Sequence, residues 1–202
     1  NFSDTIKLLK IRGHAMQTAV PKGEGGMVAV LGSTVQIMEK ILNENQSLSS
    51  VQIANDNSEG QLVLSGKIND LSNLIEILKS KNIKNIRLPV SAPFHCKLMG
   101  KATEIMRREI KELDFQESEK KLISNVTANE INDKEQLKDL LIKQIENRVR
   151  WRESVINMIN KEVNQFIEIG PGKVLSGLVK RINKDVKINT INNENDIKDL
   201  EI

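Results

Sequence analysis

Residues 27–90 switch between strand-like and helix-like apolar spacing, and this alternation limits the folds open to the chain more than any other feature. Short β-branched runs bounded by polar segments predict strands, and apolar residues at three- and four-residue steps predict helices. The predicted elements are strands at 27–32, 51–55, 61–66 and 86–90 and helices at 33–45 and 68–82. Their order, β-α-β-β-α-β, is that of a ferredoxin-like module. The polar segment 55–60 would be the loop between its second and third strands.

Strands and helices also alternate outside this module. The expected elements are a helix capped by Ser3 or Asp4 and ending near Ala19, a helix after His95, a strand at 122–126, helices at 134–146 and 151–160, a strand at 166–170, a helix at 172–182 and a strand at 186–190. On the first helix, Ile6, Leu9 and Met16 would share one face. Such alternation favours a mainly parallel α/β sheet. We therefore predict an α/β protein with a small βαββαβ subdomain at 25–90 inserted into a larger subdomain formed by 1–24 and 91–202, whose first strands the chain lacks.

Composition restricts the class of protein. A chain of 202 residues, 39% hydrophobic and with net charge +3, suits one globular unit without a nucleic-acid-binding basic tract. One cysteine excludes an internal disulfide framework and fits a reducing compartment, and no apolar run approaches the roughly 20 residues of a membrane span. Two distant histidines and one cysteine offer no metal-ligand spacing. We expect a cytoplasmic monomer, with an organelle matrix left open, without metal, membrane or nucleic acid.

His95 is the first candidate for chemistry. It follows Pro89 and Pro93 in "LPVSAPFHCKLM" (88–99), and prolines make the approach stiff and extended. A helical pattern begins at Cys96, so His95 stands at a braced loop-to-helix junction. A general base there needs a nucleophile from elsewhere and an acceptor that orients it. A capping or surface histidine is the alternative, and Cys96 fits a buried hydrophobe better than a Cys–His dyad.

Arg12 is the second candidate, in "IRGHAMQ" (11–17) on the first predicted helix. Its guanidinium, with Gly13 and Met16 nearby, would suit the carboxylate of a small acyl group. A surface arginine on an amphipathic helix explains the same residues, and on spacing alone it is the better explanation. The strand–glycine turn–helix at 167–177 matches neither a Walker A loop nor G-x-G-x-x-G, so it is a weak phosphate site.

Several long motifs in fixed order resemble the malonyl-CoA:acyl carrier protein transacylases of fatty acid synthesis. They are "IRGHAMQTAVPKGEGGMVAVLG" (11–32), "IANDNSEGQLVLSG" (53–66), "LPVSAPFHCKLM" (88–99), "QIENRVRW" (144–151) and "IEIGPGKVLSGLVKRI" (167–182). The resemblance covers nearly the whole chain. It implies an α/β-hydrolase-like acyltransferase domain with a ferredoxin-like insert, in agreement with the element order.

The resemblance also implies a two-step reaction without a cofactor. In that family a serine in a G-H-S-x-G elbow takes malonyl from malonyl-CoA and passes it to the phosphopantetheine thiol of acyl carrier protein. A hydroxyl is a weak nucleophile until a base takes its proton. His95 would be that base and then the acid, and Gln144 would orient it through its backbone carbonyl.

The same resemblance assigns substrate-binding residues. Arg12 would pair with the malonyl carboxylate, which also rejects uncharged acyl groups such as acetyl. Met16 would line the pocket, and Phe94 would suit a small acyl group. Asn55 and Asn57 would border the cleft at the insert.

The chain departs from the family pattern, and the early glutamine loop that helps form the family's oxyanion hole is among the missing parts. It has no G-x-S-x-G or G-H-S, so the nucleophile is expected upstream of Asn1. These 202 residues alone should therefore not catalyse malonyl transfer. Arg148 stands where relatives commonly have proline.

Three other functions stay open. A ferredoxin-like module can bind RNA, although its central strands here lack the aromatic residues on which bases stack. A truncated transacylase could bind acyl carrier protein without catalysis, which the missing elbow favours. The same residues could transfer another acyl group. Arg12 argues against this, because its guanidinium matches a carboxylate.

Overall fold

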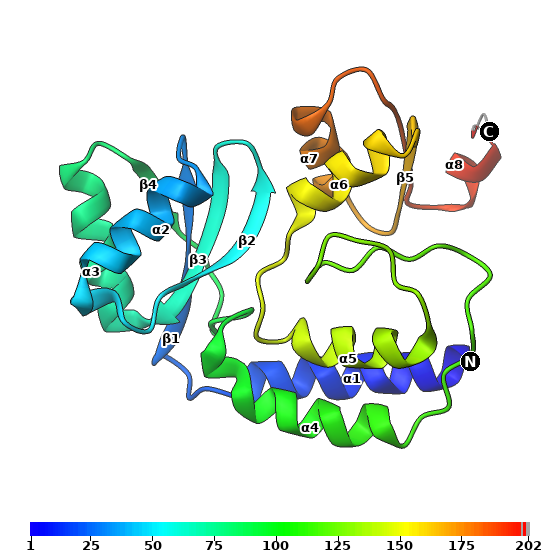
Figure 1. The fold of residues 1–202 in the computed structure, drawn as a ribbon, viewed down its shortest axis with the longest axis horizontal. Coiled ribbons are helices and arrows are strands. Elements are labelled where there is room, and N and C mark those ends of the chain that lie inside the picture. The colour runs from blue at the N-terminus through cyan, green and yellow to red at the C-terminus, as the bar shows by residue number, and fades with distance from the viewer. Residues whose placement is uncertain (199, 201–202) are drawn as a thin grey trace.

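The computed structural model describes residues 1–198 and 200. Figure 1 shows three groups of elements: a sheet with two helices, a group of helices, and a C-terminal part. In chain order the elements are α1 (Phe2–Thr18), β1 (Gly25–Leu31), α2 (Val35–Glu44), the 3-10 turn η1 (Gln46–Leu48), β2 (Gln52–Ser58), β3 (Gln61–Lys67), α3 (Ile68–Ser80), β4 (Lys84–Arg87), the 3-10 turn η2 (Lys97–Met99), α4 (Gly100–Lys111), α5 (Lys134–Lys143), α6 (Trp151–Asn160), β5 (Gln165–Ile169), α7 (Val174–Ile182), β6 (Lys187–Ile191) and α8 (Glu194–Lys198).

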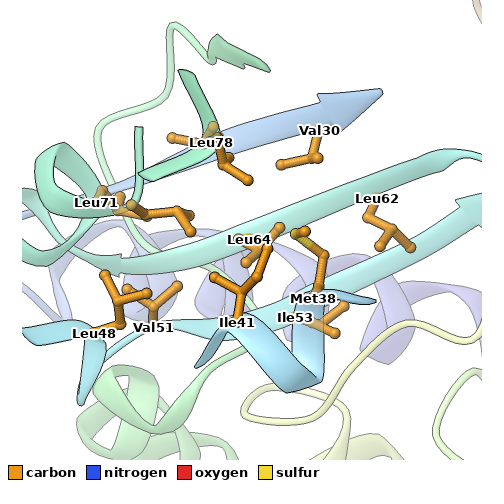
Figure 2. Packing of buried hydrophobic residues seen from close by; sticks show 12 residues of the cluster. Val30, Met38, Ile41, Leu48, Val51, Ile53, Leu62, Leu64, Leu71 and Leu78 are labelled. Carbon is orange, nitrogen blue, oxygen red and sulfur yellow. The ribbon is translucent and has the colours of Figure 1, made fainter. Parts of the chain in front are cut away.

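The first group is an antiparallel sheet in the order β2-β3-β1-β4 with α2 and α3 on the same side (Figure 1). This order confirms the ferredoxin-like module. Because side chains alternate across a strand, Val28 and Leu64, which are paired in register, point toward the helices, and Met27 points to the opposite face. Figure 2 shows Leu64 packed beside Met38 and Ile41 of α2 in this core.

The opposite face of the sheet turns toward the segment that carries His95. Met27, Ala54 and Val63 form a small apolar cluster there, and Leu88 and Phe94 pack against it. The Ser65 hydroxyl donates a hydrogen bond to the Phe94 carbonyl at 2.6 Å. The sheet thus supports the approach to His95 directly.

The second group contains α1, α4 and α5, which lie side by side (Figure 1). Their buried contacts come from Ala15, Met16, Ala19, Ala92, Met99, Ala102, Met106, Ile110, Ile142 and Ile145. Two expectations for α1 are wrong. Ile6 and Leu9 are 49% and 56% exposed rather than packed with Met16. The cap is Asn1, whose side chain accepts from the Asp4 amide at 3.0 Å and so takes the place expected for Ser3 or Asp4.

The C-terminal part pairs β5 with β6 in parallel, with α6 and α7 beside them. The expected strand at 122–126 is reduced to one bridge between Ile123 and Glu130. The fourth strand of the sheet is Lys84–Arg87, earlier than expected, although Leu88 still donates its amide to Met27. Most of the expected loop at 55–60 belongs to β2, which runs to Ser58 because it pairs with β3 as far as Ser58 and Gln61. Asn55 also forms one bridge to Val149.

The proposed division into subdomains at 25–90 and 1–24 with 91–202 stays a prediction, and residues 199, 201 and 202 lie outside the described residues. Within the described part, no helix is both long and apolar enough to cross a bilayer.

Candidate active site

His95 is held by its backbone conformation and by a single ring contact. Its φ of 58° lies in the left-handed region, which non-glycine residues adopt at a cost of about 1 kcal/mol. Its Nδ1–H donates to the Gln144 carbonyl oxygen at 2.9 Å. Because a carbonyl oxygen only accepts, the neutral ring carries its proton on Nδ1 and leaves the Nε2 lone pair free. The ring is therefore set up as a base at Nε2.

The neighbouring Cys96 takes no part in this arrangement. It is fully buried, and its thiol donates to the Pro93 carbonyl at 3.1 Å. Burial raises the pKa of Cys96 to about 11, so the thiol stays protonated at neutral pH. The interpretation of Cys96 as a small buried side chain is confirmed.

The surroundings of His95 favour its neutral form. Burial lowers the pKa of His95 below its ordinary 6.5, and the nearby Arg12 charge adds to this, while the bond to Gln144 opposes it. A lowered pKa leaves the ring deprotonated at pH 7. The free base is then present above the folded-state pKa and is lost as the pH falls through it.

We expect an NMR titration of the imidazole signals to give His95 a midpoint below 6.5. The chain contains only one other histidine, His14, so a His14→Gln variant assigns the signals. Replacing Arg12 with alanine removes a nearby positive charge and should move the His95 midpoint upward. A His95 midpoint above 6.5 in the unaltered protein would contradict the assignment, because the Gln144 bond would then outweigh burial.

Arg12 lies on α1 and contacts the side chain of Gln144, whose backbone carbonyl binds His95. Its Nη2 donates to Gln144 Oε1 at 2.8 Å, although the two residues are 132 positions apart. Burial lowers the pKa of Arg12, yet a guanidinium remains charged at neutral pH. Gln144, the C-cap of α5, thus holds His95 through its backbone and Arg12 through its side chain.

Asn125 completes the cluster and was missed by the sequence analysis. Gln144 Nε2 donates to Asn125 Oδ1 at 3.0 Å. Asn125 lies in the segment that was expected to be a strand, and neither its spacing nor its neighbours mark it as a site residue. Only the folded chain brings it to Gln144.

An open cleft of about 460 Å³ lies beside this cluster. His95, α2, β2 and the segment 146–150 line it. Arg148 extends along this wall and forms an ion pair with Glu39 of α2, with 3.4 Å between Nη1 and Oε1. The cleft therefore gives a small molecule access to His95.

In the described part of the chain, the other predicted site residues form no hydrogen bond with Arg12, Gln144 or Asn125, although Phe94 directly precedes His95. Met16 is 5% exposed and packs in the apolar cluster of α1, α4 and α5. Phe94 is half-buried between that cluster and the sheet. Asn55 and Asn57 lie in β2 rather than in a loop, and neither is among the residues that line the cleft with His95. Their substrate-binding roles stay predictions.

The weak phosphate site at the glycine turn is occupied by the chain itself. The amides of Leu175 and Ser176 at the start of α7 donate to the Glu168 carboxylate at 3.1 and 2.7 Å. This carboxylate takes the place that an anion would occupy at the helix N-terminus. Among the described residues, no cluster of three or more histidine, cysteine, aspartate or glutamate side chains is arranged to hold a metal ion.

Comparison with known proteins gives consistent results. The family model described as "Acyl transferase domain" matches residues 2–199. A malonyl CoA-acyl carrier protein transacylase of Bacillus subtilis is 39% identical over 189 residues, which are 93% of this chain and 60% of that protein. The crystal structure of a malonyl CoA-acyl carrier protein transacylase from Clostridium perfringens superposes with a TM-score of 0.94 at 38% identity and covers 98% of this chain. An acyl-carrier-protein-S-malonyltransferase from Bartonella henselae gives a TM-score of 0.93 at 40% identity. The chain spans 63% of the length of each of these two structures.

Proposed function

The chain belongs to the acyl transferase domain family, and from this we propose that it transfers malonyl from malonyl-CoA to the phosphopantetheine thiol of acyl carrier protein. One observation supports the proposal above others: Gln144 holds both a base, His95, and a candidate carboxylate-binding cation, Arg12. Transfer of a charged acyl group needs both groups at one centre.

The proposed mechanism is covalent catalysis by a serine that lies upstream of Asn1. His95 Nε2 takes the serine hydroxyl proton while the serine oxygen attacks the thioester carbonyl of malonyl-CoA. The carbon–sulfur bond breaks, and the CoA thiolate leaves with the proton from His95. In the second half His95 takes the proton of the phosphopantetheine thiol, whose sulfur attacks the malonyl carbonyl; the bond to the serine oxygen breaks, and His95 returns the proton to that oxygen. The Gln144 carbonyl stabilises the imidazolium in both halves.

Arg12 would bind the free carboxylate of the malonyl group. A guanidinium has five N–H donors, and the bond to Gln144 uses one Nη2 donor, so others remain for a carboxylate. Met16 and Phe94 would form the apolar wall beside it, and Asn55 and Asn57 would border the insert. We further propose that the protein works as a cytoplasmic monomer and needs no cofactor.

A second candidate function is binding of acyl carrier protein without catalysis. One observation favours it: the 202 residues contain no G-x-S-x-G or G-H-S elbow. In this case Arg12 and His95 would take part in catalysis only after a complementing segment that carries the nucleophile has bound.

The test is the intact mass of the protein, as its gene encodes it, before and after incubation with malonyl-CoA, followed by addition of acyl carrier protein. We expect a mass well above 22.8 kDa, gain of one malonyl group, and its loss to the carrier thiol. Acetyl-CoA is the control and should load poorly. Sustained transfer by a verified 22.8 kDa chain would contradict the upstream serine. Carrier binding without an adduct would favour the second function.

A further inference from the structure

The two ends of the Gln144 side-chain amide have different partners on different elements. Its oxygen accepts from Arg12 on α1, and its nitrogen donates to Asn125 Oδ1 on the segment between α4 and α5. From this arrangement we propose that Asn125 is a positioning residue that sets the orientation of the Gln144 amide and through it holds Arg12 in place. The catalytic part of this inference rests on the proposed function, in which Arg12 binds the malonyl carboxylate.

The chemistry of Arg12 permits only one orientation of the Gln144 amide. An arginine side chain offers donors only, so the Gln144 oxygen must face it. The Gln144 nitrogen then faces Asn125, whose side-chain oxygen accepts from it. Rotating the amide by half a turn would place Gln144 Nε2–H groups against the Arg12 guanidinium and leave both without an acceptor. Asn125 therefore stabilises the orientation that Arg12 requires.

Asn125 is itself firmly mounted. Its own carbonyl accepts from the Arg150 amide at 2.8 Å. The residue before it, Ser124, bonds through its backbone to Asn129 and Ala128 at 2.9 and 2.8 Å. A side chain on such a braced turn loses little conformational entropy when it holds Gln144, because the backbone is already ordered.

The bond between Asn125 and the Gln144 side chain has little influence on His95, the base. His95 bonds to the backbone carbonyl of Gln144, which the side-chain rotation does not move. Loss of Asn125 should therefore weaken carboxylate recognition and spare the acid–base step. This split separates a positioning role from a general loss of structure.

The variants Asn125→Ala, Asn125→Asp and Asn129→Ala test the inference in the protein as its gene encodes it. Alanine removes the acceptor, and aspartate keeps one. Asn129→Ala removes the same chemical group from the same turn, where the side chain contacts Asn157 instead of Gln144. The measurements are kcat/KM for malonyl-CoA and for acetyl-CoA and the exchange rate of the Gln144 side-chain amide protons by NMR.

For Asn125→Ala we expect about a tenfold loss of the malonyl-over-acetyl preference, the size that one hydrogen bond supports, with the acid limb of the pH profile unmoved. Exchange of the Gln144 amide protons should rise by a similar factor. Asn125→Asp and Asn129→Ala should stay within about twofold of the parent in the preference.

Unchanged Gln144 exchange in Asn125→Ala, or unchanged preference where Arg12→Ala loses it, would overturn the inference. If Arg12→Ala itself leaves the preference intact, the proposed role of Arg12 fails. The inference then fails in its catalytic part, and the exchange rate still decides whether Asn125 orients the amide.

Discussion

Replacing His95 with alanine is expected to lower kcat for malonyl transfer by about 10³-fold while the protein stays folded. The reason is the Nε2 lone pair, which the Nδ1–H bond to Gln144 leaves free and which alanine removes. Rapid-quench measurement of malonyl-enzyme formation and of transfer to acyl carrier protein checks both half-reactions. Both should slow, because the proposed mechanism uses the same nitrogen in each of them.

The matched control for this prediction is Cys96→Ala, one residue away. Cys96 is fully buried, its thiol is protonated and bonded to Pro93, and we expect its loss to change kcat by less than about threefold. Circular dichroism of both variants excludes unfolding as the cause. If Cys96→Ala lost activity as severely as His95→Ala, or if His95→Ala retained it, the assignment of the base would be wrong.

Replacing Arg152 with alanine is expected to lower the free energy of unfolding by about 3 kcal/mol, the lower end of the range for breaking a buried ion pair. Arg152 on α6 binds Asp56 of β2 through two nitrogens, with distances of 3.0 Å from Nε to Oδ1 and 2.8 Å from Nη2 to Oδ2. Asp56 is 1% exposed, so its carboxylate would lose its partner in the interior. Because the Arg152 side chain is 31% exposed, we expect the loss of unfolding free energy to lie at the low end of this range. Urea unfolding followed by circular dichroism measures it.

A double-mutant cycle tests the cause. Asp56→Asn combined with Arg152→Ala leaves no buried charge, so it should recover part of the stability lost in Arg152→Ala. Removing the exposed pair of Lys40 and Glu44, with side chains 74% and 55% exposed, should cost less than about 1 kcal/mol. A loss below about 1 kcal/mol in Arg152→Ala would show that this ion pair does not hold β2 to α6.

The order of elements in the ferredoxin-like module could be predicted because it depends on local spacing. Val28, Leu64 and Leu74 recur at the positions that strand and helix periods require, and the buried core confirms them. The error at 55–60 arose because polar composition is typical of loops, whereas pairing decides where a strand ends. β2 extends to Ser58 because Asp56 and Ser58 pair with Leu62 and Gln61 of β3, and the polar residues give no sign of this pairing.

The first helix shows a second kind of error. Its apolar residues predicted one buried face, yet Ile6 and Leu9 are exposed, because the apolar cluster with α4 and α5 covers the side that carries Leu8, Ile11 and Ala15 instead. Periodicity shows that a helix is amphipathic, but the neighbours decide which apolar residues they cover. The cap at Asn1 instead of Ser3 or Asp4 is a shift within the usual uncertainty of helix ends.

In the candidate site, too, some features follow from the local sequence and others depend on tertiary contacts. The sequence alone placed His95 just before a helical segment and suggested that Cys96 is a small buried side chain, and η2, which begins at Lys97, and the full burial of Cys96 agree with this. The stiff, proline-braced mounting stays a prediction. The meeting of Arg12, His95, Gln144 and Asn125 depends on bonds across 132, 49 and 19 positions. Backbone and side-chain preferences act over a few residues, whereas such bonds form only after α1, α5 and the turn at Asn125 have packed. Only the tertiary structure could therefore decide that one glutamine joins the base to the cation.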